Sequence, residues 1–262
     1  MTAIHTLASG SSGNALVLSW EGGTILVDAG ISCRRIRQGL QALGLGDLDG
    51  IFITHTHSDH ISGLQTLLKH TRCPVFASAQ AGRDLLRRMV LPEDRLREAE
   101  GTFFVKDCAV TAFPTSHDAP GSRGYRFDTP DGGFGLMTDS GFVTGEAAAV
   151  LPGVALALLE ANHDVEAVRS GPYPFFLKKR ILGPEGHLCN EDAAAFAVRL
   201  AEAGAREIVL AHLSRENNTP AMALRAVETA LRAAELSPRL SAAPQDGLGG
   251  AYVLGGGAAC TE

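Results

Sequence analysis

A histidine-rich stretch, His-Thr-His-Ser-Asp-His, occupies residues 55–60. It follows the apolar run 50–54 directly, so we expect a tight turn at the end of a buried strand. Imidazole nitrogens suit zinc and its first-row neighbours, whereas carboxylates suit harder ions such as manganese. Such a turn can aim the first two histidines at one ion and the Asp-His pair at a second. The spacing predicts a metal site rather than a solvated polar turn, with the candidate ligands His55, His57, Asp59 and His60.

Three later residues of ligand type share this situation, because each follows an apolar segment that we expect to be a strand. They are His117, Asp139 and His212. In α/β proteins, the strand ends at one side of a sheet collect the residues that bind ligands and catalyse reactions. Taken singly, each residue could equally cap a turn or complete a hydrogen bond in the core. Together with the first cluster, they predict one shared site.

The bulk composition is that of an ordinary globular protein. The chain has 262 residues, of which 45% are hydrophobic and 20% charged, and the sequence contains no apolar run near the roughly 20 residues that span a bilayer. We expect no export signal, and the five scattered cysteines indicate free thiols in a reducing cytoplasm. The net charge of −6 argues against a generally basic nucleic-acid coat. It still permits a local basic channel, for which two clusters are candidates, Arg34-Arg35-Arg37 and Lys178-Lys179-Arg180.

Short apolar segments alternate with amphipathic ones along the whole chain. Strands are expected at 15–18, 24–27, 51–54, 74–78, 110–114, 125–127, 134–138, 155–159 and 207–211, with a final one near 251–254 in the glycine-rich stretch 245–257. Helices are expected after a Ser32 cap, over 80–90, after an Asn190 cap and after Thr219-Pro220. No linker separates two units. Two similar halves meeting near residue 150 predict two sheets between helices, as one domain over residues 1–262.

The ordered set Asp28, His55-x-His57-x-Asp59-His60, His117, Asp139, His212 resembles the metallo-β-lactamase superfamily. The likeness is closer to one branch, the YycJ-like (WalJ, VicX) metallohydrolases, and covers nearly the whole chain. The strings that carry it are LASGSSGN at 7–14, VDAGIS at 27–32, SHDA at 116–119, LEANHD at 159–164, GPYP at 171–174, GHLCN at 186–190 and HLSRENN at 212–218.

This resemblance implies an α/β fold, an αββα sandwich of two mixed sheets flanked by helices, with two divalent metal ions in the groove between the sheets. One ion would be held by His55, His57 and His117, the other by Asp59, His60 and His212, with Asp139 bridging. Asp28 would orient a ligand histidine without binding metal itself. Seven ligands leave room for a water that two ions would ionise near neutral pH to a bridging hydroxide. Zinc or manganese is expected, and iron or nickel is the alternative.

Other residues are candidates for catalysis or substrate contact. In related phosphodiesterases a histidine at the place of His187 contacts the phosphate and helps the leaving oxygen depart; a structural cap is the alternative. His163 could bind substrate or metal, or complete a turn. The loop 9–14, through Ser11 and Asn14, could form a small anion nest or a plain turn. Lys179, in the second basic cluster, could contact the substrate. The candidate catalytic residues are Asp59 and His187, and the candidate substrate contacts are Ser11, Asn14, His163 and Lys179.

The reaction that the resemblance favours is phosphodiester cleavage, by a 5′-to-3′ exonuclease acting on DNA, with RNA as the alternative substrate and no membrane partner. The chain is too short for the extra domain of the longer RNA-processing nucleases, and it lacks the long arm of tRNA 3′-processing enzymes. A small-molecule phosphodiesterase or lactonase would use the same metals. A non-catalytic metal-binding regulatory protein is a further hypothesis, but it would not need His187. Redox di-iron proteins of this fold carry glutamate where His57 stands, which disfavours that class.

Overall fold

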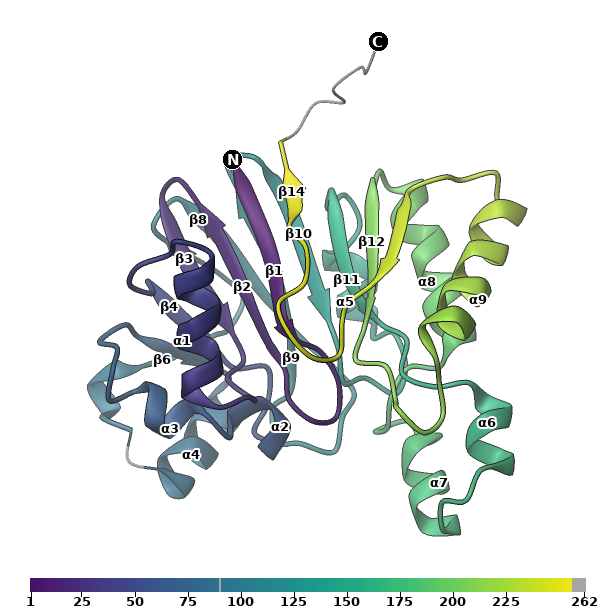
Figure 1. The fold of residues 1–262 in the computed structure, drawn as a ribbon, viewed down its shortest axis with the longest axis horizontal. Coiled ribbons are helices and arrows are strands. Elements are labelled where there is room, and N and C mark those ends of the chain that lie inside the picture. Colours follow the sequence, from purple (N-terminus) through teal and green to yellow (C-terminus); the bar gives the residue numbers. More distant parts are fainter. Residues whose placement is uncertain (90, 256–262) are drawn as a thin grey trace.

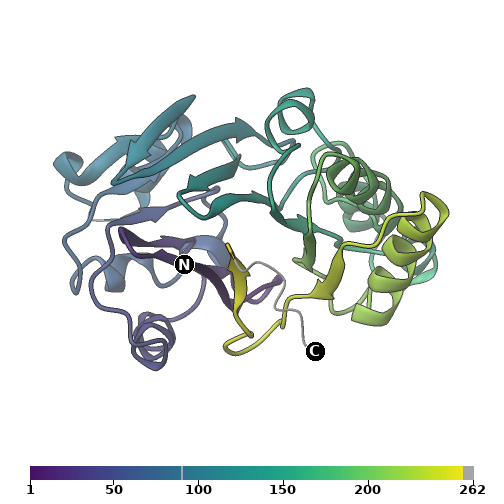
Figure 2. The ribbon, with the colours of Figure 1, turned by 90° about the horizontal axis from the view of Figure 1, so that it is seen from above.

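Two sheets lie face to face, with helices on their outer sides (Figures 1 and 2). The computed structural model describes residues 1–89 and 91–255. Within them the first sheet has seven strands, in the order β14 (Tyr252–Leu254), β1 (Thr2–Ala8), β2 (Ala15–Trp20), β3 (Gly23–Val27), β4 (Gly50–Phe52), β5 (Val75–Ala77) and β6 (Leu96–Glu98). The second also has seven, in the order β13 (Arg239–Ala242), β12 (Glu207–Ala211), β11 (Leu156–Glu160), β10 (Gly132–Met137), β9 (Arg123–Thr129), β8 (Cys108–Pro114) and β7 (Thr102–Val105).

Both sheets are mixed. In the first, β14, β1, β2 and β3 pair antiparallel and β3 to β6 pair parallel. In the second, β7 to β10 pair antiparallel and β10 to β13 pair parallel. The parallel strands need crossover connections, and helices supply most of them. The αββα sandwich expected from the sequence is confirmed.

Helices cover the outer faces of the sheets (Figure 1). The first half of the chain contains α1 (Cys33–Ala42), α2 (Ser58–Ile61), α3 (Leu64–Leu67), α4 (Ala79–Arg88) and a 3₁₀ turn (Glu93–Arg95). The second half contains α5 (Gly145–Val150), α6 (Val165–Ser170), α7 (Phe175–Ile181), α8 (Asn190–Glu202) and α9 (Pro220–Ala233). Among the residues that the structure describes, no helix combines the length and apolarity needed to cross a bilayer.

The core between the sheets is aromatic at its centre. Phe52 of β4 stacks on Phe76 at a ring distance of 4.6 Å and meets Tyr125 and Phe127 of the second sheet edge-on, each at 5.3 Å. Separate apolar clusters lie outside each sheet, beneath α1, α3 and α4 on one side and beneath α8 and α9 on the other. Because both faces of each sheet are covered, several strands are buried along their length. This explains why they read as continuous apolar runs rather than as alternating patterns.

Most of the expected elements are present, and several boundaries move. The Ser32 hydroxyl accepts a hydrogen bond from the Arg35 amide at the start of α1, and Thr219 caps α9 in the same way, with Pro220 in the first turn. The expectation for Asn190 is wrong. Cys189 caps α8 through its sulfur, and Asn190 is the first helical residue. Its side chain is instead paired with Asn218, which removes it from the capping position.

The expected boundary between two halves near residue 150 is also wrong. The chain passes from the first sheet to the second between β6 and β7, near residue 100. In the second sheet the antiparallel strands β7 to β10 precede the parallel ones along the chain. The same order holds in the first sheet, where β1 to β3 come first. Val90 of the expected helix 80–90, Gly256 and Gly257 of the expected stretch 245–257, and Cys260 lie outside the described residues.

Candidate metal centre

The candidate ligands follow strands of both sheets and lie in loops, except for Asp59 and His60, which lie in the short helix α2. The segment 55–60 follows β4, while His117, Asp139 and His212 follow β8, β10 and β12 of the second sheet. The backbone is left-handed at Asp28, Asp139 and His212, with φ between 54° and 57°. A residue with a Cβ adopts this backbone conformation only at an energetic cost, and residues strained in this way are concentrated at functional sites. It turns the chain sharply where each strand ends, so the side chains of two sheets reach one groove.

Close backbone contact holds the histidine-rich turn in place. The Asn14 amide donates to the Asp59 carbonyl at 2.8 Å, and the Ala29 amide donates to the His60 carbonyl at 2.8 Å. A Cβ on Gly30 would lie 1.6 Å from the Asp59 oxygen, so only glycine fits there. The turn is therefore fixed by the loops after β1 and β3 as well as by its own strand.

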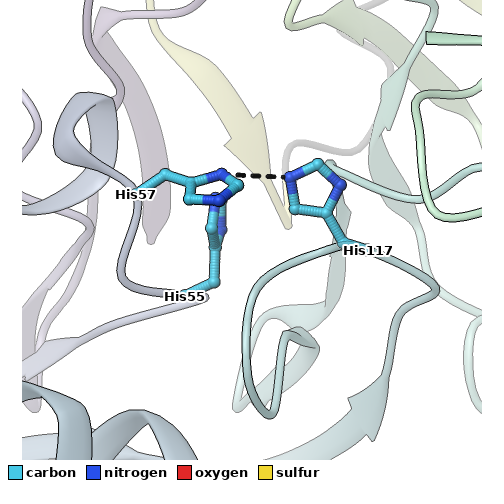
Figure 3. A group of neighbouring side chains, drawn as sticks. All are labelled: His55, His57 and His117. Atoms are coloured by element: carbon cyan, nitrogen blue, oxygen red, sulfur yellow. Dashed lines mark hydrogen bonds between the residues drawn. The ribbon is translucent and has the colours of Figure 1, made fainter. Parts of the chain in front are cut away.

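Three imidazoles form the first ligand group (Figure 3). His57 Nδ1 lies 3.2 Å from His117 Nε2, and the ring of His55 stands 4.7 Å and 5.0 Å from those two rings. Two nitrogens bound to one tetrahedral zinc lie about 3.3 Å apart, given zinc–nitrogen bonds of about 2.0–2.1 Å. The spacing of the His57 and His117 nitrogens is therefore that of two ligands of one ion.

Asp59, His60 and His212 form the second ligand group. The Asp59 carboxylate lies 3.5 Å from His60 Nε2 and 3.7 Å from His212 Nε2. Both rings are buried, whereas Asp59 is partly exposed. This group matches the set expected around a second ion.

Asp139 lies between the two groups. Its Oδ1 is 3.7 Å from His117 Nε2 and 3.6 Å from His212 Nε2, and its Oδ2 is 3.4 Å from His60 Nε2. One carboxylate thus faces ligand nitrogens of both groups. That is the position a bridging ligand requires.

Three buried atoms at the centre of this arrangement lack a hydrogen-bond partner among the described residues. They are His55 Nε2, His212 Nε2 and Asp139 Oδ2. Buried polar atoms are nearly always paired, so several unpaired ones in one place need an explanation. Imidazole nitrogens and a carboxylate oxygen are donors that zinc and its neighbours accept. The buried histidine and aspartate clusters fit a site for two metal ions.

The charges of the site lead to the same interpretation. Burial alone would lower the pKa of His60, but Asp28 and Asp139 outweigh it and raise that pKa to about 10. His212 behaves alike, because Asp139, Asp59 and Glu160 outweigh burial and raise its pKa well above the usual value. Without another cation, protons on these rings balance the buried carboxylates. Divalent cations would supply that balance and free the ring nitrogens as ligands.

Two carboxylates behind the ligands set the orientation of three histidine rings. Asp28 accepts hydrogen bonds from His60 Nδ1 at 2.7 Å and from the Thr54 amide at 2.9 Å. Glu160, which sequence reasoning missed, accepts from His212 Nδ1 at 3.0 Å and from His187 Nδ1 at 2.8 Å. Each bond leaves Nε2 of the ring as the nitrogen that faces the groove.

Glu160 is fully buried at the end of β11, a strand the sequence predicted. Its second oxygen accepts from the amides of Ser140 and Leu188, each at 3.0 Å. Burial would raise its pKa, but His187 and His212 outweigh burial and lower it to about 2. The signal that could have found it is the one used for the other ligands, an acidic residue at the end of an apolar strand.

His187 lies at the rim of the groove. Its side chain is 18% exposed, its Nδ1 is 3.7 Å from Asp139, and its ring stands 5.1 Å from that of His117. The ring therefore faces both ligand groups while keeping access to solvent.

A second network that sequence reasoning missed supports the histidine turn from behind. Thr56, between two candidate ligands, is fully buried and donates to Asp84 of α4 at 2.5 Å. Arg88 of the same helix pairs with Asp84 at 2.7 Å and donates to the Thr56 carbonyl at 3.0 Å. Asp84 and Thr56 are 28 residues apart, and no local pattern marks them as partners.

The remaining candidates are placed differently. Asn14 is buried, with its Nδ2 3.0 Å from His60 Nε2, whereas Ser11 is exposed in the same loop. His163 is 1% exposed, burial lowers its pKa, and it belongs to none of the ligand groups found among the described residues. Lys179 is exposed on α7. The other basic cluster lies on α1, where Arg34 and Arg37 line a hollow of about 860 Å³ that includes none of the ligand residues.

Comparisons with known proteins agree with this geometry. Residues 23–213 match a family model described as a beta-lactamase superfamily domain. The chain is 38% identical over 237 residues to the exodeoxyribonuclease WalJ of Streptococcus pneumoniae, covering 88% of each chain. It is 36% identical over 230 residues to the exodeoxyribonuclease YycJ of Bacillus anthracis, covering 86% of this chain and 87% of that one. Among solved structures, the metallo-beta-lactamase fold protein YhfI of Bacillus subtilis superimposes with a TM-score of 0.70 at 14% identity, covering 95% and 99% of the two chains.

Proposed function

The chain belongs to the metallo-β-lactamase superfamily, and from that premise we propose that it is a two-metal exodeoxyribonuclease working in the 5′-to-3′ direction. The observation that carries the proposal is the pair of ligand groups joined by Asp139, with three buried ligand atoms left unpaired within the described residues. The choice of DNA rests on the two relatives named exodeoxyribonucleases, which match most of this chain.

We assign His55, His57 and His117 to one ion, Asp59, His60 and His212 to the other, and Asp139 to both. Zinc or manganese suits this mixture of imidazole and carboxylate, and iron or nickel is the alternative. Two such ions would ionise a water near neutral pH and neutralise charge on the attacking and leaving oxygens of a phosphodiester.

The protein's own residues supply orientation and a proton. Because Glu160 accepts from His212 Nδ1, the proton of that ring is held on Nδ1 and Nε2 is free to bind metal. The same carboxylate accepts from His187 Nδ1, so it orients that ring and leaves Nε2 as the nitrogen that can meet the substrate. The His187 Nε2–H would then protonate the leaving oxygen, which makes His187 the general acid of the proposal.

Substrate contact is assigned more narrowly than the sequence suggested. Ser11 and Lys179 are exposed and stay as proposed contacts. Asn14 is buried against His60, so its proposed role is to brace the second ligand group. His163 is buried, and we therefore leave it out of direct substrate contact.

We also propose that residues 1–262 form one domain, because the core between the sheets draws on strands from β1 to β14. A cytoplasmic location completes the proposal. It is supported by the free thiols of the four described cysteines, Cys33, Cys73, Cys108 and Cys189, which a reducing compartment would preserve.

The test is hydrolysis of 5′- and 3′-labelled single- and double-stranded oligonucleotides by metal-stripped protein, with manganese or zinc restored. Stepwise release from the 5′ end, absent from Asp59→Ala, is the expected result. Turnover of a chromogenic phosphodiester without cleavage of any oligonucleotide would replace the exonuclease with a small-molecule phosphodiesterase.

His187→Ala separates acid catalysis from metal binding. We expect it to lower kcat by about 10²-fold or more while both ions stay bound, since a general acid contributes about 10²–10⁴-fold. Metal content by mass spectrometry accompanies the kinetics. Loss of an ion from this variant would make His187 a ligand instead.

A further inference from the structure

The charges of the chain are distributed unevenly over the sandwich. Residues 29–91, which supply α1 to α4 outside the first sheet, contain eight lysines and arginines against four acidic residues. The whole chain has 23 basic and 29 acidic residues, so its acidic excess lies entirely outside this segment. A local basic surface can attract a polyanion even on a protein with a negative net charge.

Helix α1 carries a basic stripe on one of its faces. Arg34, Arg37 and Gln41 follow one another three and four residues apart, so their side chains lie on the same face of the helix. All three are exposed. Within the described residues, the guanidinium groups of Arg34 and Arg37 form no ion pair and no side-chain hydrogen bond. Both groups are therefore available to a ligand.

This stripe lines a hollow of about 860 Å³ between α1, the loop 44–48 and α3. His70, which follows α3, adds a further nitrogen donor to the lining. Among the described lining residues, Asp47 is the only one with a carboxylate. Two unpaired guanidinium groups outweigh it, and the fork of donors on each arginine matches the oxygens of a phosphate. The hollow therefore suits a ligand with several phosphate charges.

Both walls of the hollow begin beside the candidate ligands (Figure 1). Helix α1 follows the loop in which Gly30 packs against the Asp59 backbone, and α3 follows α2, which contains Asp59 and His60. The two walls are joined at this point, because the Gly63 amide donates to the Ala29 carbonyl at 2.8 Å. Helix α1 has ten residues and is therefore about 15 Å long. At about 3.4 Å per nucleotide along a DNA strand, its length corresponds to about four or five nucleotides.

We propose that Arg34 and Arg37 bind backbone phosphates of the DNA substrate in this hollow, a few nucleotides away from the cleaved bond. The inference rests on the proposed nuclease function. A polynucleotide is favoured over a free nucleotide because the basic surface continues outside the hollow, at Lys69, Arg72 and Arg83. These three side chains are exposed and have no ion pair within the described part of the chain. Phosphate contacts position a nucleic acid without reading its sequence, so the site serves any sequence.

The experiment compares wild type with the double variant Arg34→Ala/Arg37→Ala. The control is Arg206→Ala/Arg225→Ala, which removes the same charge from two exposed arginines, one before β12 and one on α9. Binding of fluorescein-labelled single strands and duplexes of about 20 nucleotides is measured by anisotropy in EDTA over a range of salt concentrations. Cleavage of the same substrates, of a trinucleotide and of a chromogenic phosphodiester is measured with manganese.

The slope of log Kd against log salt reports the number of phosphate contacts, at about 0.9 for each contact to a duplex and about 0.7 for each to a single strand. Loss of two contacts should therefore reduce the slope by about 1.8 for the duplex and about 1.4 for the single strand. We expect KM for the long substrates to rise about tenfold or more in Arg34→Ala/Arg37→Ala. The trinucleotide is too short to reach the hollow and should be cleaved as by wild type, and the control variant should match wild type throughout.

An unchanged salt slope in Arg34→Ala/Arg37→Ala would overturn the site. Equal losses in the control variant would also overturn it, because net charge alone would then explain them. A loss as large for the trinucleotide as for the long substrates would contradict the remote position. Weaker binding of deoxyadenosine monophosphate or of anionic lipid vesicles, with DNA binding unchanged, would assign the hollow to another ligand. If wild type neither binds nor cleaves oligonucleotides, the nuclease proposal itself fails, and that outcome is distinct from these.

Discussion

Replacing Glu160 with glutamine tests how this buried carboxylate controls the tautomers of the histidines that it contacts. The carboxylate accepts four hydrogen bonds, from His187 and His212 through one oxygen and from the Ser140 and Leu188 amides through the other. Glutamine has the same shape but only one oxygen, and its NH₂ group donates. In either orientation of the amide, two buried donors lose their acceptor. At about 1–3 kcal/mol for each unsatisfied group, the variant loses about 2–6 kcal/mol unless the rings change tautomer.

A change of tautomer is the cheaper outcome, and it damages the metal site. If His212 moves its proton from Nδ1 to Nε2, its Nδ1 can accept from the new amide. The Nε2 that faces Asp59 and Asp139 then carries hydrogen and cannot bind metal. Loss of such an outer partner typically costs 10–100-fold in metal affinity. We therefore expect Glu160→Gln to bind one ion at least about tenfold more weakly and to lose kcat by about 10²-fold or more.

The assay is calorimetric titration of the metal-stripped variant with zinc or manganese, together with oligonucleotide hydrolysis. Glu191→Gln is a suitable control, because Glu191 is an exposed glutamate in the first turn of α8. The control should match wild type in both measurements. Two ions bound with wild-type affinity and an unchanged kcat in Glu160→Gln would refute the reasoning about the ring tautomers.

Three further predictions concern the support of the histidine turn. Thr56→Val removes a buried hydrogen bond to Asp84 and should lower the free energy of unfolding in urea by about 1–2 kcal/mol, with weaker binding of one ion; an unaltered urea midpoint would contradict it. Burial would raise the pKa of Asp84, but the Thr56 hydroxyl and a neighbouring guanidinium outweigh burial and lower it below its ordinary 3.8. This carboxylate therefore stabilises the fold fully above that pH, and progressively less as the pH falls through the folded-state pKa. The free energies of unfolding of wild type and Asp84→Asn should therefore converge as the pH falls from about 4 to about 2. A difference that stays constant over this range would count against the assignment. Gly30→Ala places a methyl group on the Asp59 carbonyl and should lower both the melting temperature and metal binding, whereas Gly46→Ala, in open space, should change neither.

The ligand residues could be predicted from the sequence because their signals are local. The segment 55–60 concentrates four of them behind one strand, and His117, Asp139 and His212 each follow an apolar strand of their own. Buried strands of a covered sheet are continuous apolar runs, so their ends can be located from hydropathy. The general position of the site follows from those ends.

The pairings that support the site could not be predicted, because the partners are far apart in sequence. Glu160 meets His212 across 52 residues, and Asp84 meets Thr56 across 28. The edge strand β14 pairs with β1 from the opposite end of the chain, and β1 itself was not expected as a strand. The Asn190 cap failed for a similar reason, since Asn218 provides a competing partner that only the tertiary structure brings close.

The boundary between the sheets shows what pattern alone cannot supply. The hydropathy of strands β7 to β10 is compatible with either sheet. Which sheet they join depends on pairing between neighbours such as β10 and β11. Local propensity carries no information about that pairing. The sequence therefore did not reveal the order of the strands, and it also missed β1, β6, β7 and β13.

The claim that two ions act together is tested most directly by titrating metal-stripped wild-type protein with manganese. Bound metal and oligonucleotide hydrolysis are followed on the same sample. We predict that two equivalents bind and that cleavage rises only as the second position fills. Full activity at one equivalent, or activity that persists after complete removal of metal, would contradict the two-metal mechanism.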